Sequence, residues 1–359
     1  MRVIISGGGT GGHIFPAIAI ANALKKMDER TEILFVGAKG RMEMEKVPAA
    51  GYKIEGLWIS GLQRRLTVDN LSFPLKVISS IMRSRKIIRS FRPDAAVGTG
   101  GFASGPLLRA AVGMGIPALI QEQNSFPGIT NKLLAKRVNK ICVAYDEMEN
   151  FFPQEKIIRT GNPVRQDILS LDGKREEAMK FFGLNSGKKT LLVIGGSLGA
   201  RTINESMAGC VEMLLKKNIQ VIWQTGKNYS YPEKRDGAWV GAFITKMDMA
   251  YSAAEVVVSR AGAISLSELA IVKKPCILVP SPNVAEDHQT KNAMALVKNN
   301  AAILVKDSEA KEKLGNEIIS LMNDEPKKKT LSENISKLAF PNAAEVIANE
   351  VIKLVQNKK

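Results

Sequence analysis

The chain has 359 residues, 45% of them hydrophobic and 24% charged, which is typical of a globular protein with two domains of about 150–200 residues each. The N-terminus leads directly into an apolar run and a glycine-rich loop, unlike a signal peptide. The longest apolar stretch, residues 95–120, contains an arginine, two prolines and several glycines, so the sequence predicts no membrane-spanning helix.

The net charge indicates the class of partner, and the cysteines indicate the cellular compartment. Lysine and arginine number 51 against 35 acidic residues, and the net charge of +16 indicates an anionic partner: nucleic acid, acidic lipid or a phosphorylated substrate. Residues 1–160 hold 23 basic and 13 acidic residues, so the first half is the more basic one. Cys142, Cys210 and Cys276 stand singly among apolar residues, which favours buried thiols in a reducing cytosol over disulfides or a zinc site.

Short β-branched runs alternate with helical patterns along the whole chain. In the first half we predict strands at residues 3–6, 33–36, 95–98, 118–120 and 140–144, and helices at 16–27, 105–113 and 128–136. The pattern restarts with a strand at 190–194, a glycine-rich turn and a helix to residue 217, followed by strands at 221–224, 256–259 and 276–279. Apolar strands alternating with helices predict parallel sheets that are covered on both faces.

The two glycine-rich turns lie half a chain apart, so we predict an α/β protein with two Rossmann-like domains. The first is expected over residues 1–160 and the second over 161–340, with the hinge at 160–165. A second break at 340–342 precedes a terminal helix, residues 343–355, and we expect the segment 341–359 to pack back on the first domain.

The first glycine loop, residues 7–13, formally contains G-x-G-x-x-G, a motif typical of dinucleotide-binding folds. That function requires an acidic residue at the end of the second strand to hold the ribose. The second strand ends at Lys39 without an acid, and Glu32 lies at its beginning, which disfavours a dehydrogenase. The glycine loop still allows backbone amides to approach an anion closely at a helix N-terminus.

Residues 9–17, Gly-Thr-Gly-Gly-His-Ile-Phe-Pro-Ala, resemble the glycine loop of the cell-wall N-acetylglucosaminyltransferase family, known as MurG. One departure is visible: the family usually has histidine before Glu122 and this chain has Gln121, which puts a proton-transfer role there in question and leaves a hydrogen-bonding role open. Further blocks follow in the family's order through both halves, at 98–106, 122–124 with 127–128, 161–165, 195–200, 259–263, 267–269 and 287–289 with 292–293.

The resemblance implies the glycosyltransferase-B fold, in which two parallel-sheet domains face each other across a cleft. The C-terminal domain would bind the UDP-sugar donor, and the N-terminal domain the lipid-linked acceptor and the membrane. The implied activity is an inverting transfer of N-acetylglucosamine from UDP-N-acetylglucosamine to the muramyl 4-hydroxyl of undecaprenyl-pyrophosphoryl-MurNAc-pentapeptide, in peptidoglycan synthesis. The protein would act peripherally on the cytoplasmic face of the bacterial plasma membrane.

The resemblance also places the donor site. Ser197 and the turn 263–268 would hold the diphosphate and ribose, and a strand end that opens into a helix suits an anion. Glu268 is expected to accept the ribose hydroxyls, Ile244 to pair its backbone with uracil, and Arg165 to neutralise phosphate. The full donor set is Thr10, Gly11, Gly12, Asn124, Arg165, Ser197, Ile244, Ala263, Ile264, Ser265, Leu266, Ser267, Glu268, Gln289 and Asn292, the last two facing the sugar.

The chain has two histidines, and they are given different roles. His288 is expected to be structural. His13 follows the anion-binding loop and opens a helix, where the dipole would favour a neutral, proton-accepting imidazole, so we expect it to deprotonate the acceptor hydroxyl. The sequence contains no Asp-x-Asp to hold a metal on the diphosphate, and we expect no obligatory divalent ion and no cofactor.

Residues 62–92 hold eight basic residues against one acid. Apolar residues recur there at helical spacing, which is equally typical of a crossover helix packed on a sheet. The resemblance favours a membrane-binding patch, because the family carries apolar residues ringed by basic ones in this segment. The predicted patch consists of Leu71, Leu75, Ile78, Ile81 and Met82 with Arg83, Arg85 and Lys86, facing anionic phospholipid.

Two alternatives remain beside the dehydrogenase. Another UDP-sugar enzyme on the same fold, such as a second lipid glycosyltransferase or an epimerase, would keep the donor site and change the blocks at 98–106 and 122–128. A nucleic-acid-binding module would use the positive charge. Only 6% of the residues are aromatic, and neither a stacking platform nor a recognition helix is visible, so no nucleic-acid partner is expected.

Overall fold

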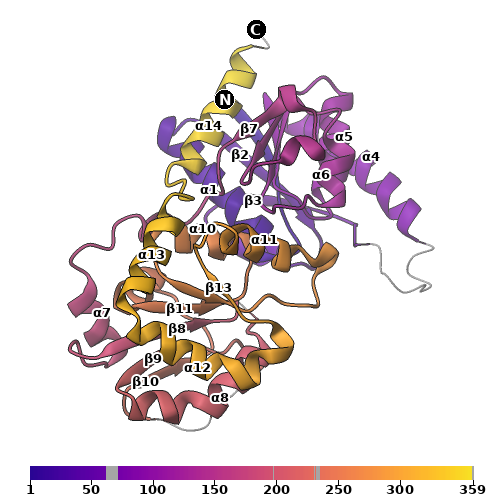
Figure 1. Cartoon of the computed structure of the whole chain (residues 1–359). Helices are drawn as coiled ribbons and strands as arrows, with labels where there is room; N and C mark the ends of the chain where they lie inside the picture. Colours follow the sequence, from indigo (N-terminus) through magenta and orange to yellow (C-terminus); the bar gives the residue numbers. More distant parts are fainter. Residues whose placement is uncertain (62–71, 197, 230, 232–234, 358–359) are drawn as a thin grey trace. The chain divides into compact units, whose positions relative to one another are not determined.

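The computed structural model describes residues 1–61, 72–196, 198–229, 231 and 235–357. Contacts divide the chain into two compact units, one formed by Met1–Val164 together with Asn342–Lys359 and the other by Arg165–Pro341. Each unit is built around its own sheet, and helices cover both faces (Figure 1).

The sheet of the first unit has the strand order β3-β2-β1-β4-β5-β6-β7, and all neighbouring strands within the described residues are parallel. The central strands β4 and β5 are buried along their whole length, as expected where helices pack on both faces. The strands are β1 (Arg2–Ser6), β2 (Glu32–Ala38), β3 (Lys53–Leu57), β4 (Ala95–Gly98), β5 (Ala118–Glu122), β6 (Lys140–Val143) and β7 (Ile157–Arg159).

Alternate residues of β1 point into two different cores, because successive side chains of a strand face opposite sides of the sheet. Val3 and Ile5 pack under α1 and α14, whereas Ile4 packs under α4 and α5. The helices of this unit are α1 (Gly11–Met27), α2 (Glu43–Ala49), α4 (Phe73–Phe91), α5 (Ser104–Gly113), α6 (Ile129–Leu134) and α14 (Ala343–Gln356), with 3-10 turns η1 (Met148–Asn150) and η2 (Gln154–Lys156).

The last helix, α14, lies in the first unit although it follows the whole second unit in sequence. It packs against α1, with Ile347 and Val351 fully buried in the shared core. A salt bridge of 2.9 Å between Lys26 and Glu345 joins the two helices at the surface.

The second unit repeats the arrangement with the order β10-β9-β8-β11-β12-β13, again with parallel neighbours. Its core is filled by the fully buried Trp223, whose indole N–H donates to Asn204 Oδ1 at 3.0 Å. The elements are β8 (Lys189–Ile194), β9 (Ile219–Gln224), β10 (Ala238–Gly241), β11 (Val256–Ser259), β12 (Cys276–Leu278), β13 (Ile303–Leu304), α7 (Arg175–Phe182), α8 (Arg201–Lys216), α9 (Met247–Ala253), α10 (Ala263–Ile271), α11 (His288–Val297), α12 (Ala310–Asn323), α13 (Glu325–Ser336), η3 (Gln166–Ile168), η4 (Ala285–Asp287) and η5 (Asp307–Glu309).

The prediction of two parallel α/β sheets is confirmed, with one helix start misplaced. The helix predicted from residue 16 begins at Gly11, because the N–H groups of His13 and Ile14 already bond to the carbonyl of Thr10. Pro16 therefore lies inside α1 and not at its start.

The three cysteines are buried and unpaired, as predicted. Burial raises the pKa of the Cys142 thiol to about 12 and that of Cys210 to about 11. Of the helices that the structure describes, none is long and apolar enough to span a bilayer.

Candidate functional site

The glycine loop of the first unit runs from β1 into α1 and is held by a buried carboxylate. Glu43 accepts hydrogen bonds from the N–H groups of Gly9 and Ala38, both at 2.9 Å. A Cβ at Gly8 would lie 2.2 Å from Glu43, so the loop passes directly over this side chain. Glu43 lies far from the loop in sequence, and the motif gave no sign of it.

The loop presents its amides at the start of α1. Thr10 is the N-cap residue but makes no side-chain capping bond, and Thr10 and Gly12 are exposed. The first N–H groups of a helix have no partner inside the helix, so those of Gly11 and Gly12 are suited to an anion or a polar ligand.

His13 follows directly and is anchored from two sides. Its Nδ1 lies 2.9 Å from Gln123 Oε1, and its carbonyl accepts a hydrogen bond of 2.7 Å from Thr99 Oγ1. Gln123 is in turn hydrogen-bonded to Gln121, and Gln121 to Asn162 at 2.9 Å. His13 is therefore the half-buried end of a chain of buried amides.

Asn124 is positioned by the carboxylate of Glu122, which is buried at the end of β5. Glu122 Oε1 accepts from the backbone N–H of Asn124 at 3.0 Å and from its side chain at 3.1 Å. Oε2 accepts from the N–H of Gly128 at 3.1 Å and from Asn131 at 2.8 Å. Glu122 thus fixes the turn after β5.

The glycine-rich turn after β8 packs tightly against the turn after β9. Gly199 and Gly226 both have positive φ, and a Cβ at Gly199 would lie 2.0 Å from the carbonyl oxygen of Thr225. Only glycine permits this approach. The predicted phosphate ligand Ser197 lies in this turn but outside the described residues.

Gln224, at the end of β9, joins this turn to Ile244. Its Oε1 accepts from the N–H of Ile244 at 2.8 Å, and its Nε2 donates to the carbonyl of Gly196 at 3.0 Å. The N–H of Ile244, whose backbone is predicted to pair with the base, is therefore already engaged by Gln224. The sequence offered no signal for Gln224.

The strand β11 opens into α10, and the helix start carries no side-chain cap. Its first turn, Ala263, Ile264 and Ser265, begins the segment 263–268 that was predicted to hold the diphosphate and ribose. Leu266 is a buried residue of this helix. Ser267 donates from Oγ back to the carbonyl of Ala263 at 3.0 Å.

One turn further along α10, Glu268 lies in a cluster of ionisable groups. Tyr251 donates its hydroxyl to Glu268 Oε2 at 3.0 Å. Burial raises the pKa of Glu268 to about 7, against the opposing effect of the nearby positive charge of Arg165. Arg165 itself forms a bidentate pair with Asp167, at 2.6 and 2.7 Å.

The two residues predicted to face the sugar both contact backbone around the site. Gln289 Oε1 accepts from the N–H of Ser281 at 2.9 Å, and the fully buried Asn292 donates to the carbonyl of Ala261 at 3.5 Å. Asn292 thereby supports the turn that starts α10. His288 is the first residue of α11.

Most of the predicted residues of the second unit thus gather beyond the carboxyl ends of β8, β9, β11 and β12, where open α/β sheets bind ligands. Residues 3–143 match the glycosyltransferase family 28 N-terminal domain, and residues 190–347 match the family 28 C-terminal domain. The chain belongs to glycosyltransferase family 28.

Relatives within family 28 extend over the full chain. A protein of Flavobacterium psychrophilum, named UDP-N-acetylglucosamine--N-acetylmuramyl-(pentapeptide) pyrophosphoryl-undecaprenol N-acetylglucosamine transferase, is 56% identical over 100% of this chain and 99% of its own. One of the same name from Cytophaga hutchinsonii is 57% identical over 100% and 98%. The crystal structure of Acinetobacter baumannii MurG superposes with a TM-score of 0.75 at 28% identity, over 98% of this chain and 99% of that one.

These similarities confirm the predicted family, the glycosyltransferase-B type of fold and the assignment as a glycosyltransferase. A dehydrogenase and a nucleic-acid-binding module are thereby set aside as the function. Within the described part of this family 28 chain, no three histidine, cysteine, aspartate or glutamate side chains gather as metal ligands.

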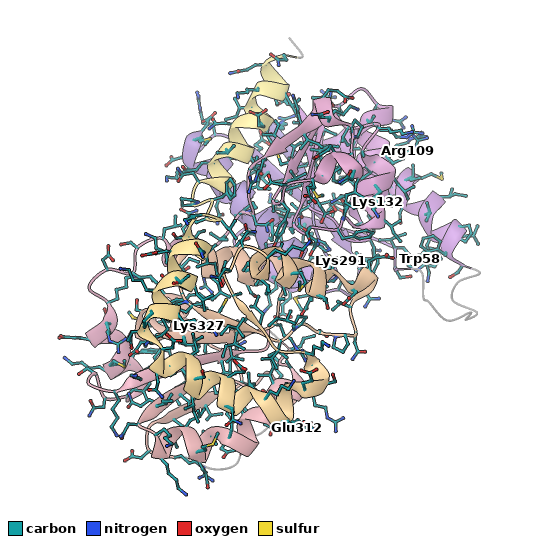
Figure 2. All side chains as sticks on the ribbon, in the orientation of Figure 1. Trp58, Arg109, Lys132, Lys291, Glu312 and Lys327 are labelled. Carbon is teal, nitrogen blue, oxygen red and sulfur yellow. The ribbon has the colours of Figure 1, made fainter. Side chains whose placement is uncertain are left out.

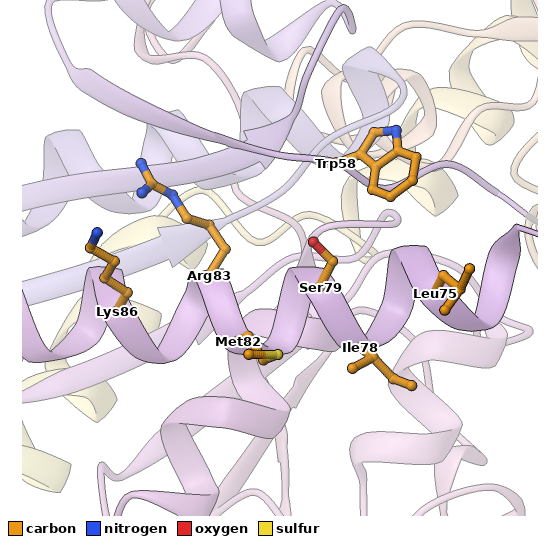
Figure 3. A pocket seen from close by; sticks show the side chains of 7 residues that line it. All are labelled: Trp58, Leu75, Ile78, Ser79, Met82, Arg83 and Lys86. Atoms are coloured by element: carbon orange, nitrogen blue, oxygen red, sulfur yellow. The ribbon is translucent and has the colours of Figure 1, made fainter.

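A second feature of the family 28 chain is the outer face of α4. Leu75, Ile78 and Met82 are 64%, 57% and 65% exposed, and with Trp58 they line an open pocket (Figure 3). Ile81, predicted for the same patch, instead packs inward against the core of the first unit. Leu71 lies outside the described residues.

Basic side chains border this pocket. Arg83 and Lys86 line it beside Ser79, and Arg85 is exposed on the same helix. Arg83 forms a salt bridge of 2.9 Å with Glu55.

Trp58 is the residue of this surface that sequence reasoning missed. It follows β3, is 54% exposed and is labelled in Figure 2. Lys76 Nζ, from the first turn of α4, lies 5.8 Å from its ring centre. Ser80 Oγ donates to the Trp58 carbonyl at 3.0 Å and fixes the backbone there.

Proposed function

We propose that this glycosyltransferase transfers N-acetylglucosamine from UDP-N-acetylglucosamine to the muramyl 4-hydroxyl of a lipid-linked muramyl-pentapeptide, converting lipid I to lipid II in peptidoglycan synthesis. The observation that carries the proposal is the identity of 56% over the full length to a transferase named for this reaction. The donor-binding features of the second unit and the basic, apolar surface of the first support it.

In the second unit, the amides at the start of α10 would bind the diphosphate, together with the glycine turn that contains Ser197. Partial charges at a helix N-terminus and fixed amide donors stabilise the negative charge that develops on departing UDP. Glu268 would accept the ribose hydroxyls, the backbone of Ile244 would pair with uracil, and Gln289 would contact the sugar.

In the first unit, His13 would act as general base in a single displacement. The proton of the acceptor hydroxyl passes to the imidazole while the oxygen attacks the anomeric carbon, and UDP leaves with the electrons of the broken bond. Attack opposite the leaving group inverts the anomeric centre. The amides of Gly11 and Gly12 and the side chain of Asn124 would contact the donor.

The outer face of α4 would place the enzyme on the membrane that carries its acceptor, on the cytoplasmic side. Each basic residue near an anionic leaflet contributes about 1 kcal/mol, and an exposed tryptophan suits the interface between lipid and water. The apolar row of Leu75, Ile78 and Met82 adds area that bilayer contact would remove from water.

The deciding experiment measures UDP release from UDP-N-acetylglucosamine by the full chain, with and without a short-chain lipid-linked muramyl-pentapeptide. We expect release that depends on the acceptor and is much slower with UDP-glucose as a matched donor. Donor binding without acceptor-dependent release would reject this acceptor, and failure to bind the donor would reject the proposed function as a whole.

A further inference from the structure

The contact between His13 and Gln123 carries information about where the imidazole proton lies. The two atoms involved, Nδ1 and Oε1, are 2.9 Å apart. A neutral imidazole has one N–H donor and one acceptor nitrogen, and its hydrogen-bond partners decide which is which. The orientation of the Gln123 amide therefore determines the tautomer of His13.

The orientation of that amide is determined by backbone carbonyls, which can only accept. Gln123 Nε2 lies 2.8 Å from the carbonyl oxygen of Thr99 and 3.1 Å from that of Gln121. The nitrogen must face these acceptors, because turning the amide over would bring three oxygens together and leave buried groups unpaired. Oε1 consequently faces His13.

The side-chain amides of Gln121 and Asn162 are oriented in the same way, each by a backbone carbonyl. Gln121 Nε2 faces the carbonyl of Glu122 at 3.3 Å and Asn162 Oδ1 at 2.9 Å. Asn162 Nδ2 donates to the carbonyl of Gln123 at 3.0 Å. Gln121 can therefore present only Oε1 to Gln123, and the three side chains, all at most 2% exposed, hold one another in a single arrangement.

We propose that Gln123 is a positioning residue that holds neutral His13 in the Nδ1–H tautomer, with Gln121 and Asn162 fixing the orientation of the Gln123 amide. The lone pair is then on Nε2, the nitrogen that Gln123 does not engage. That this lone pair deprotonates the acceptor hydroxyl rests on the proposed function. The amides orient the imidazole without adding a charge, unlike the aspartate of a serine-protease triad.

The tautomer can be measured in the ligand-free protein, independently of any activity. The chain has two histidines, so ¹⁵N-histidine labelling gives two imidazole spectra, which a His288→Gln variant assigns. The spectra are followed to alkaline pH until they no longer change, so that both rings are compared in the neutral form. We expect the Nδ1–H pattern for His13, and an Nε2–H pattern would overturn the inference outright.

Gln123→Met removes the acceptor while keeping the length of the side chain. We expect its His13 spectrum to shift towards the Nε2–H tautomer, and kcat for transfer to fall by about 10-fold or more with KM for the donor nearly unchanged. An unchanged spectrum in this variant would reject the role of Gln123. If wild type shows the expected tautomer but transfers no sugar, the proposed function fails and the tautomer assignment stands.

Gln220→Met is the matched control. Gln220 is a buried glutamine of the second unit whose amide bonds twice to the backbone of Asn185, at 2.8 Å each. Its loss should cost similar stability and leave the His13 spectrum and kcat as in wild type. An equal change in both variants would assign the effect to general destabilisation and overturn the proposal.

Discussion

The hydroxyl of Tyr251 and the carboxylate of Glu268 lie 3.0 Å apart, with the hydroxyl as donor. Burial raises the pKa of Glu268 to about 7, while the nearby positive charge of Arg165 and the hydrogen bond from Tyr251 act in the opposite direction. The Glu268 carboxylate, which is proposed to accept the ribose hydroxyls, is thus about half-protonated near neutral pH in the ligand-free unit. Donor binding should therefore depend on pH in the physiological range.

We expect the affinity for UDP-N-acetylglucosamine to rise between pH 6 and pH 8. With a pKa of about 7, the ionised fraction of Glu268 increases roughly 10-fold over this range, and the ionised form is the better acceptor for two hydroxyls. Calorimetric titration at several pH values would measure it. Glu268→Gln should bind more weakly and with little pH dependence, whereas a pH dependence that persists in this variant would exclude Glu268 as its source.

The glycine turns after β8 and β9 allow a matched pair of alanine substitutions. At Gly226, φ is 83° and a Cβ would lie 2.3 Å from the backbone nitrogen of Gly199, so alanine must displace the turn. We expect Gly226→Ala to weaken donor binding at least 10-fold. Gly209→Ala on α8, where a Cβ would meet no atom within 4 Å, should bind normally and gain about 0.5–1 kcal/mol in stability.

Gln121 stands where the family usually has histidine, and its contacts explain how the two can interchange. Gln121 accepts from Gln123 and donates to Asn162 at 2.9 Å, with a longer contact of 3.3 Å to the carbonyl of Glu122. A neutral imidazole has one acceptor and one donor, enough for the two shorter bonds. We expect Gln121→His to keep kcat within a factor of about 3, whereas Gln121→Leu leaves buried amides unpaired, at a cost of about 1–3 kcal/mol each. Equal losses in the two variants would contradict this account.

Flotation with vesicles rich in anionic phospholipid would test the surface on α4. Ile78→Glu combined with Met82→Glu places two charges on residues that are 57% and 65% exposed, and we expect vesicle binding to fall at least 10-fold with an unchanged Tm. Met213→Glu, on α8 of the second unit, is the control and should bind as wild type. Undiminished binding by the double variant would remove this surface from consideration.

Turnover is expected to persist in the presence of a chelator, since the sequence has no Asp-x-Asp and amides are proposed to stabilise departing UDP. Transfer should be measured in excess EDTA and again after adding Mg²⁺. Complete loss in EDTA and recovery with Mg²⁺ would show that a metal ion is required.

Sequence reasoning found the central strands of both sheets and missed the strands at their edges. All four missed strands, β3, β7, β10 and β13, are terminal in the strand order. Edge strands pack on fewer neighbours and need fewer apolar residues. Two of the missed strands are mostly half-buried, β3 (Lys53–Leu57) and β10 (Ala238–Gly241). A continuous apolar run is a signal of central strands only.

The parts of the site that lie within one short sequence motif were predictable. Contacts between residues far apart in sequence were not. The glycine turns and the start of α10 were visible as short segments. The contact of His13 with Gln123 joins residues 110 positions apart, and Glu43 reaches Gly9 across 34. Spacing in one sequence carries no information on such contacts, so the groups that orient the imidazole and the loop emerged only from the structure.

The position of α14 has a consequence for synthesis of the protein. Ile347 and Val351 complete a core whose other side chains come mainly from the first half of the chain. At translation rates of about 5–20 residues per second, roughly 10 to 40 s separate the emergence of Val164 from that of Val351. During that time the core residues of the nascent first unit that α14 will cover lack their partners, while the second unit, Arg165–Pro341, is still being synthesised.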